Sequence, residues 1–195
     1  MSAHHFSYGK TVDYITGDLI IDTDNERARQ KIAKFLVEEK GYLKKDIQQR
    51  RKISLIVDGN KGETTVDFII KINGKSFAAV IFGPGSIVTR QRTAIASARL
   101  VESYEVPYAI ITNGKDAEVM KTQSARVIGK GLNSIWHKTE AQKKAQDHIY
   151  QTVSDKRKEM EKRILYAYEV LAEKECDEFK CAFCVPHVKQ ENMND

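Results

Sequence analysis

The chain has 195 residues, of which 41% are hydrophobic and 30% charged. This composition provides enough apolar surface for a folded core and argues against an intrinsically disordered chain. No apolar run approaches the roughly 20 residues of a membrane span, and the first residues, MSAHHFSYGKTVDYI, lack the apolar core of a signal peptide. We therefore expect a cytoplasmic protein that does not contact membranes. The net charge of +5 favours a polyanionic partner, although 27 acidic residues dilute the field.

The N-terminal part of the chain predicts one helix after a segment with little periodicity. Residues 1–25 are expected to be irregular or to supply a short pairing strand. In TDNERARQKIAKFLVEEKGY the apolar residues recur at helical spacing, with Asp24 or Asn25 placed to cap the first turn and Gly41 to end the helix. Glu26 would lie in the first turn of this amphipathic helix.

Three strands are predicted next. Residues 53–57 and 66–70 alternate between apolar and polar side chains, which is the period of a half-buried strand. The dipeptide Asn73-Gly74 predicts a tight hairpin turn, because both positions tolerate positive φ. Residues 77–82 are continuously apolar and predict a strand that is buried on both faces.

The second half of the chain predicts more helix than strand. SIVTRQRTAIASARLVESY indicates a helix that Ser86 or Thr89 could cap, VPYAIITNG a short buried strand, and AEVMKTQSARVIGKG a small hairpin or edge strand. Residues 139–175 predict one long helical region, with a narrow apolar stripe among Lys, Glu and Gln.

This order of elements resembles the core of the PD-(D/E)XK nuclease superfamily. The stretches ERARQKIAKFLVEEKGY, VDFIIKINGKSFAAVI and ARLVESYEVPYAIITNGKDAEVM are similar to the N-terminal nuclease domain of type I restriction enzyme R subunits, and to small stand-alone proteins that share it. The resemblance covers residues 26–132. It implies an α/β fold with a restriction-endonuclease-like core over residues 26–135 (helix, three-stranded meander, helix, strand), an N-terminal segment 1–25 and a helical extension 139–175.

The resemblance also implies where a metal site would lie. In the superfamily an acid on the first helix, an Asp on the second strand and a Glu-x-Lys on the third hold a divalent ion that polarises the phosphate. Glu26 and Asp67 match the first two positions and would hold magnesium, whereas the Glu-x-Lys position falls at about Ile81-Phe82-Gly83. Lys71, four residues after Asp67 on one strand, would be the substitute for the missing lysine.

Two functions remain open on these residues. The leading hypothesis is a DNA- or nucleic-acid-associated protein whose nuclease chemistry is degenerate. The alternative is an active magnesium- or manganese-dependent deoxyribonuclease that uses Glu26, Asp67 and Lys71. Each acid also has a purely structural interpretation. Asp67 could be a solvent-facing residue of a half-exposed strand, and Glu26 could offset the helix dipole.

Basic residues near these positions are the candidates for contact with nucleic acid. The run KKDIQQRRK contains Arg50, Arg51 and Lys52 just before the first strand. In GPGSIVTRQR, Arg90 and Arg92 lie in the first turns of the second helix, after a glycine-rich turn. Either group could instead be an ordinary solvated surface.

The three cysteines lie close together near the C-terminus. Within residues 176–187, ECDEFKCAFCVPH places Cys176, Cys181, Cys184 and His187 at spacings that predict a structural zinc site, ahead of an iron–sulfur cluster. The alternative is three free thiols, with Phe179 and Phe183 packed on the core. A third function class stays open as well: the charged helical tail could dock a partner or a second copy in a homodimer.

Overall fold

The computed structural model describes residues 7–171, in a mixed α/β fold. The strands of the main sheet are β3 Ile47–Val57, β4 Asn60–Ile72, β5 Lys75–Phe82, β6 Tyr108–Thr112, β7 Ala117–Lys121 and β8 Arg126–Lys130. The helices are α1 Asp24–Lys34, α2 Gln91–Leu100, α3 Lys138–Gln146 and α4 Asp155–Leu165, and a small separate sheet consists of β1 Ser7–Val12 and β2 Leu19–Thr23. None of the helices within residues 7–171 is long and apolar enough to cross a membrane.

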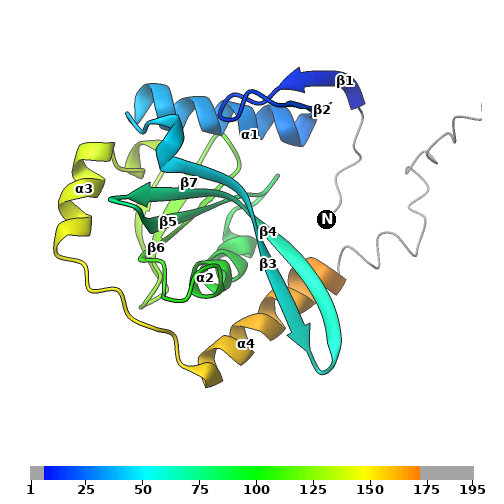
Figure 1. The fold of residues 1–195 in the computed structure, drawn as a ribbon, viewed down its shortest axis with the longest axis vertical. Helices are drawn as coiled ribbons and strands as arrows, with labels where there is room; N and C mark the ends of the chain where they lie inside the picture. The colour runs from blue at the N-terminus through cyan, green and yellow to red at the C-terminus, as the bar shows by residue number, and fades with distance from the viewer. Residues whose placement is uncertain (1–6, 172–195) are drawn as a thin grey trace, which may run out of the picture.

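The main sheet has its six strands in chain order, β3-β4-β5-β6-β7-β8. All neighbours are antiparallel except β5 and β6, which are parallel and are connected through α2. Asn73 and Gly74 have φ angles of 51° and 79°, so the predicted β4–β5 hairpin turn is confirmed. The small sheet β1–β2 lies over α1, on the side of that helix away from the main sheet (Figure 1).

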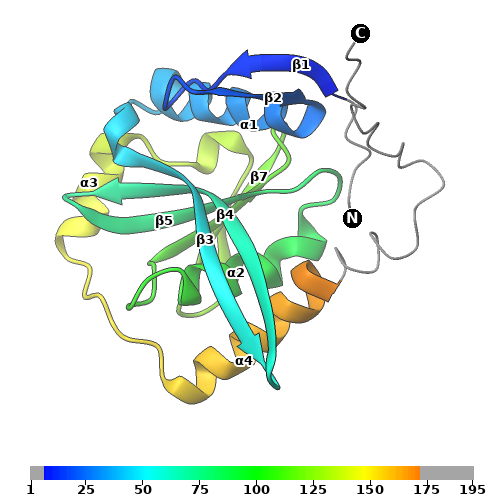
Figure 2. The ribbon, with the colours of Figure 1, turned by 45° about the vertical axis from the view of Figure 1, so that its right-hand side comes forward.

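Helices cover both faces of the main sheet, and each face has its own core (Figure 2). On the face of α1 and α3 the core contains Ile32, Leu36, Phe68, Ile70, Phe77, Val80, Ile110 and Val119. On the face of α2 and α4 it contains Leu55, Val66, Ile69, Ile81, Ile95, Ile111, Met120 and Leu165. This double burial is the reason that β5 is continuously apolar from Phe77 to Phe82.

The first helix begins one residue earlier than the predicted caps would allow. Thr23, in an extended conformation, is the cap, and its Oγ1 accepts a hydrogen bond from the amide of Glu26 at 3.2 Å. Neither Asp24 nor Asn25 caps the helix. Gly41 has a φ of 73°, as its predicted role in ending the helical segment requires. Neither Ser86 nor Thr89 caps α2: its N-cap residue is Arg90, which forms no side-chain capping bond, and the Thr89 hydroxyl donates to the carbonyl of Ser86.

The hairpin of β3 and β4 changes face partway along its length. Residues an even number apart on a regular strand point to the same face. Ile47 nevertheless packs in the core beneath α1, whereas Ile53, six residues further along β3, packs in the core beneath α2. On β4 the change falls between Val66 and Phe68. The residue at the crossing on β3 is Arg50, whose φ of 50° is rare for a residue with a side chain. A left-handed residue within a strand reverses the alternation, and the hairpin therefore passes from one layer to the other.

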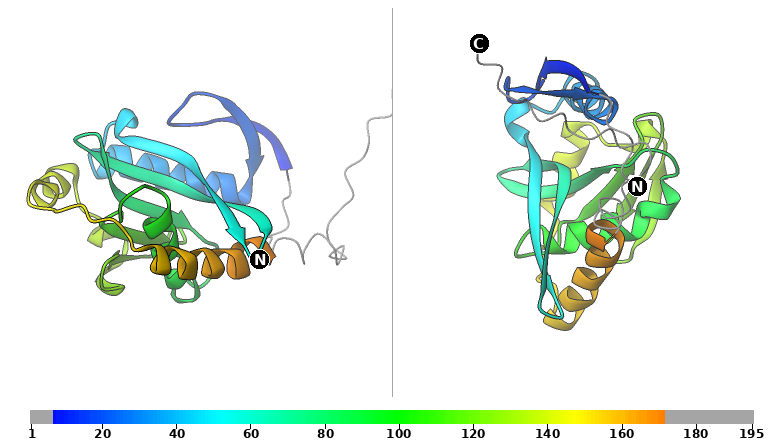
Figure 3. Two further views of the ribbon diagram at one scale, coloured as in Figure 1. Left: turned by 60° about the horizontal axis from the view of Figure 1, so that its bottom comes forward. Right: turned by 90° about the vertical axis from the view of Figure 1, so that its right-hand side faces the viewer.

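The C-terminal helical region is not one long helix. Helices α3 and α4 are separated by residues 147–154, and α4 continues into a π-helical turn, Tyr166–Val170. Helix α4 runs along α2 (Figure 3), and Leu165, Tyr166 and Val170 are buried against the sheet. The buried face of this segment is therefore not the predicted stripe, of which Met160, Tyr168 and Leu171 are exposed.

Close packing of this C-terminal turn on β4 leads to a stability prediction. A Cβ added at Gly62 would lie 2.8 Å from both methyl groups of Val170, which are too short to move aside. Gly62→Val is expected to lower the free energy of unfolding by about 1–3 kcal/mol, in urea titrations. Val170→Ala in the same chain should recover part of that loss. Lys61→Val, at an exposed position of the same strand, is the matched control and should be nearly neutral.

Candidate functional site

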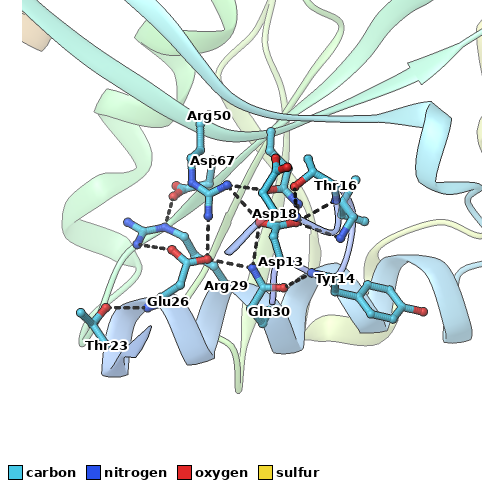
Figure 4. Close-up of polar contacts among 12 residues, drawn as sticks. Asp13, Tyr14, Thr16, Asp18, Thr23, Glu26, Arg29, Gln30, Arg50 and Asp67 are labelled. Atoms are coloured by element: carbon cyan, nitrogen blue, oxygen red, sulfur yellow. Dashed lines mark hydrogen bonds and ion pairs between the residues drawn. The ribbon is translucent and has the colours of Figure 1, made fainter. Parts of the chain in front are cut away.

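A cluster of buried carboxylates and half-exposed arginines lies where the β3–β4 hairpin changes face (Figure 4). Its members come from four separate segments: Asp13 from the β1–β2 turn, Glu26 and Arg29 from α1, Arg50 from β3 and Asp67 from β4. The β3–β4 register places Arg50 opposite Asp67, since Gln49 pairs with Phe68 and Arg51 with Val66. The face change therefore turns both side chains toward α1.

Asp67 is held on both of its oxygens. Its Oδ1 accepts from Nε of Arg29 at 2.5 Å, and its Oδ2 accepts from the backbone amide of Phe82 at 2.7 Å. Only 7% of the residue is exposed. Burial raises the pKa of Asp67, and the Arg29 guanidinium and the Phe82 amide oppose this shift without cancelling it. Asp67 is thus not the solvent-facing residue of a half-exposed strand.

Glu26 and Asp13 share the guanidinium group of Arg50. Nη2 of Arg50 donates to Oε1 of Glu26 at 2.8 Å, and Nη1 donates to Oδ2 of Asp13 at 3.0 Å. Gln30, one turn after Glu26, donates to both carboxylates. Since Arg50 bridges two buried acids, these contacts stabilise the left-handed backbone at the crossing, which would otherwise be strained.

Asp13 fixes the β1–β2 turn to the cluster. Its side chain accepts from the amides of Ile15 and Thr16 within its own turn, and from Gln49 and Arg50 on β3. Burial by itself would raise the pKa of Asp13, but these hydrogen bonds outweigh it and hold the pKa at about 2.

The low pKa of Asp13 predicts an acid-dependent contribution to stability. A carboxyl whose pKa is lower in the folded state stabilises the fold above its unfolded pKa of about 3.9, and that contribution is lost as the pH falls toward 2. Asp13→Asn should therefore cost about 2 kcal/mol in unfolding free energy at pH 7 and almost nothing near pH 2. Urea titrations across this range measure the difference. Asp18→Asn, at an exposed position of the same turn, is the control.

The Glu-x-Lys position beside this cluster carries no charge. Ile81 is buried in the core beneath α2, and the ring of Phe82 lies 5.4 Å from Cζ of Arg29. A Cβ added at Gly83 would lie 2.3 Å from Cδ of Arg90, so the Arg90 side chain fills the space that a longer side chain at position 83 would enter. Gly83 and Arg90 are therefore sterically matched.

Lys71 does not join the cluster. Ile70 and Ile72 on either side of it pack in the core beneath α1, so Lys71 points to the opposite face of the sheet. Asp67, in contrast, contacts Arg29 on α1. A spacing of four residues fails as a guide here, because the face of β4 changes at Asp67.

The other predicted basic residues are distributed around the site. Arg51 and Arg92 are exposed, and no hydrogen bond or ion pair engages either of them among residues 7–171. Lys52 pairs with Glu63 at 2.7 Å, both of them largely exposed. Arg50 pairs with the carboxylates, and the side chain of Arg90 packs on Gly83 and is partly buried. Arg51 and Arg92 are thus the exposed members of this group without a hydrogen bond or ion pair in the part of the chain that is described.

The cofactor prediction has to be corrected. Across residues 7–171 there is no group of three or more His, Cys, Asp or Glu side chains that could hold a metal ion. Glu26 and Asp67, predicted to bind magnesium, direct their oxygens to Arg29, Arg50 and Gln30 instead. The predicted ligands Cys176, Cys181, Cys184 and His187 lie outside the described residues, so neither zinc nor an iron–sulfur cluster finds support.

Sequence reasoning missed Asp13, Arg29 and Gln30 as members of the site. The letters ER-RQ did contain the signal, since Glu26, Arg29 and Gln30 stand three and four residues apart on one helix face. Asp13, followed by Gly17 with a φ of 81°, had the composition of a turn that caps itself. Nothing in the sequence, however, indicated that this turn would reach α1 and β3.

The stretch TNGKDAEV has a structural role next to the cluster. The side chain of Asn113 accepts from the amides of Lys115 and Asp116 and donates to the carbonyl of Gly85 at 3.0 Å. It thereby holds the turn at the end of β6 against the loop that leads from β5 into α2.

Comparison with known proteins identifies the family. Residues 24–135, more than half of the chain, match the family described as Type I restriction enzyme R protein N terminus (HSDR_N). A search of curated proteins finds no match, and neither does a search of solved structures. The matched residues run from the start of α1 to the end of the main sheet and include four members of the cluster, Glu26, Arg29, Arg50 and Asp67. The chain therefore belongs to the family of type I restriction enzyme R protein N-terminal domains.

Proposed function

We propose that this chain is a DNA-associated protein with a PD-(D/E)XK-type core over residues 26–135, in which the nuclease site has become a structural ion-pair cluster. Membership of a restriction-enzyme family supports a restriction-related role and an association with DNA. The order of elements, α1, β3, β4, β5, α2 and β6, agrees with this core and supports the fold assignment.

The state of Asp67 is the observation that carries the proposal. A catalytic acid would need free lone pairs for a cation that polarises the phosphate. Both oxygens of Asp67 instead accept short hydrogen bonds from nitrogen donors, and the neighbouring Glu-x-Lys position is Ile81, Phe82 and Gly83. In place of a metal, Arg29 supplies the positive charge that the buried carboxylate needs.

Contact with DNA would come from arginines outside the cluster. Three buried carboxylates face only two guanidinium groups there, so the cluster offers no excess positive charge to a phosphate. Arg51 and Arg92 are exposed and unengaged within the described residues, and guanidinium groups bind phosphate oxygens in a bidentate manner. We assign them as phosphate contacts, with Lys52 at the edge of the surface.

A salt titration tests the assigned phosphate contacts. Arg51→Ala/Arg92→Ala is expected to weaken binding to duplex DNA and to make the slope of log K against log salt concentration shallower by about 1.8, at ~0.9 per phosphate contact. Arg126→Ala/Lys143→Ala, which removes two exposed charges elsewhere, should leave the slope unchanged. Absence of salt-dependent binding to duplex, single-stranded and branched DNA by the unaltered protein would refute the proposal.

A cleavage assay tests the loss of catalysis. Supercoiled and single-stranded DNA are incubated with the protein in magnesium and in manganese, beside the near-isosteric variant Asp67→Asn. We expect no cleavage above that of the variant. Cleavage that disappears in Asp67→Asn would instead favour the active nuclease, and Lys71→Ala would then show whether that lysine contributes.

A further inference from the structure

An exposed apolar surface lies on the small N-terminal sheet. Val12, Leu19 and Ile21 have exposed fractions of 58%, 70% and 63%. Val12 and Leu19 are direct partners in the β1–β2 register, and Ile21 lies two residues further along β2. These three side chains consequently form one contiguous patch on the same face of the sheet, which we name the hairpin face.

The small sheet has reason to be covered on this face. A two-stranded sheet is at best marginally stable in water unless it packs against another element. Its contacts with α1 involve Tyr8 of β1, strand β2 and the turn at Asp13, whereas the side chains of the hairpin face are exposed. Three large aliphatic side chains on the hairpin face are thus left in water, and the fold within residues 7–171 does not explain this patch.

The C-terminal segment of the same chain has the matching composition. In residues 179–185, FKCAFCV, every residue except Lys180 is apolar. In an extended segment the side chains of Phe179, Phe183 and Val185 would lie on one side, so that side would be apolar. Phe179 lies eight positions after Leu171, the last residue described, and eight steps of extended chain can span up to about 27 Å.

Geometry and size favour this occupant over a second copy of the chain. The end of the α4 segment and β1 lie on the same side of the molecule in Figures 1 and 2. A stable interface between two proteins needs about 800 Å² from each partner and 20–30 residues, far more than three side chains provide. A tethered segment needs much less, because its effective concentration is in the millimolar range.

We propose that residues 179–185 dock on the hairpin face formed by Val12, Leu19 and Ile21. The contact is independent of the proposed function in DNA binding, and it gives the C-terminal cysteines and phenylalanines a packing role. Through Asp13, which lies directly after Val12, the docked segment would also support the turn that holds Arg50 in the cluster.

The cysteine distribution of the chain allows a direct test. All three native cysteines lie in the C-terminal segment, so a single new cysteine reports where that segment is found. Leu19→Cys, in the full chain under mild oxidation, should form an intramolecular disulfide with Cys181 or Cys184 at least about tenfold faster than Ile149→Cys. Ile149 is also exposed, at 78%, and lies between α3 and α4. Removal of Cys181 and Cys184 by serine should abolish the product.

A second variant separates docking from chance collision. In the Leu19→Cys chain, Phe179→Ser/Phe183→Ser keeps the tether and the thiols but removes the apolar side chains. Crosslinking should then slow to the rate of Ile149→Cys. Equal rates for Leu19→Cys and Ile149→Cys, no effect of the serine substitutions, or disulfides that form only between chains would each overturn the proposal.

Discussion

Replacing Glu161 with alanine is expected to lower the free energy of unfolding by about 3–5 kcal/mol, because it removes a buried carboxylate that two guanidinium groups share. The buried guanidinium of Arg99 then keeps one ion pair, the longer one with Glu105 at 3.2 Å. Oε1 of Glu161 accepts from Nη1 of Arg99 at 2.6 Å and from Nε of Arg157 at 2.5 Å. The side chains of Glu161 and Arg99 are 1% and 6% exposed, so water cannot replace the lost carboxylate. This pair connects α4 to α2, and its loss should detach the C-terminal helix first.

Urea titration and hydrogen exchange together check this result. The unfolding midpoint should fall, and amides of α4 should exchange faster than those of β5. Glu159→Ala is the matched control on the same helix, since its ion pair with Lys162 is largely exposed and should contribute less than about 1 kcal/mol. Equal effects of Glu161→Ala and Glu159→Ala would show that the buried pair does not hold the helix.

Arg29→Ala is expected to destabilise the fold by a similar amount, about 3–5 kcal/mol at neutral pH. The substitution leaves Asp67 buried with only the Phe82 amide as a donor, and it removes a weaker ion pair with Glu26 at 3.7 Å. The pKa of Asp67, already raised by burial, should rise further, because the opposing guanidinium is gone.

The sign of the pH dependence follows from that shift. A carboxyl whose folded pKa is raised opposes folding once the pH exceeds its unfolded pKa, and the cost grows until the pH passes the folded pKa. The loss caused by Arg29→Ala should therefore be smallest near pH 4 and largest at neutral pH. Urea titrations at several pH values measure this trend.

The double variant Arg29→Ala/Asp67→Asn removes the charge together with its partner. It should recover much of the stability and show little of the pH dependence, because the neutral side chain can still accept from the Phe82 amide. A loss for Arg29→Ala that is the same at every pH, or no recovery in the double variant, would contradict the role assigned to this ion pair.

The stability measurements also bear on function. If Arg29 serves Asp67 as a structural counterion, its loss must lower the free energy of unfolding whether or not DNA is present. The phosphate contacts proposed at Arg51 and Arg92 behave in the opposite way: they should alter the salt dependence of DNA binding and leave the unfolding free energy nearly unchanged. The two sets of variants therefore distinguish a structural cluster from a DNA-binding surface.

Local chemistry in the sequence determined much of the fold. The β4–β5 turn was predictable because Asn73 and Gly74 are among the few residues that accept positive φ. The double burial of β5 followed from its unbroken apolar run, and the end of the first helical segment from Gly41. The absence of charge at the Glu-x-Lys position could also be predicted from the sequence, since Ile81, Phe82 and Gly83 have no ionisable side chains.

Only the tertiary structure decided what the charged residues do. The left-handed backbone at Arg50 reverses the face of the β3–β4 hairpin, so strand alternation misplaced Lys71, and the break at residues 147–154 shifted the buried face of α4 away from the predicted stripe. Asp13 reaches Arg50 from a turn that is 37 residues distant in sequence. Periodicity reports which local face is apolar, whereas the partner of a buried charge is set by long-range contacts that no local pattern encodes.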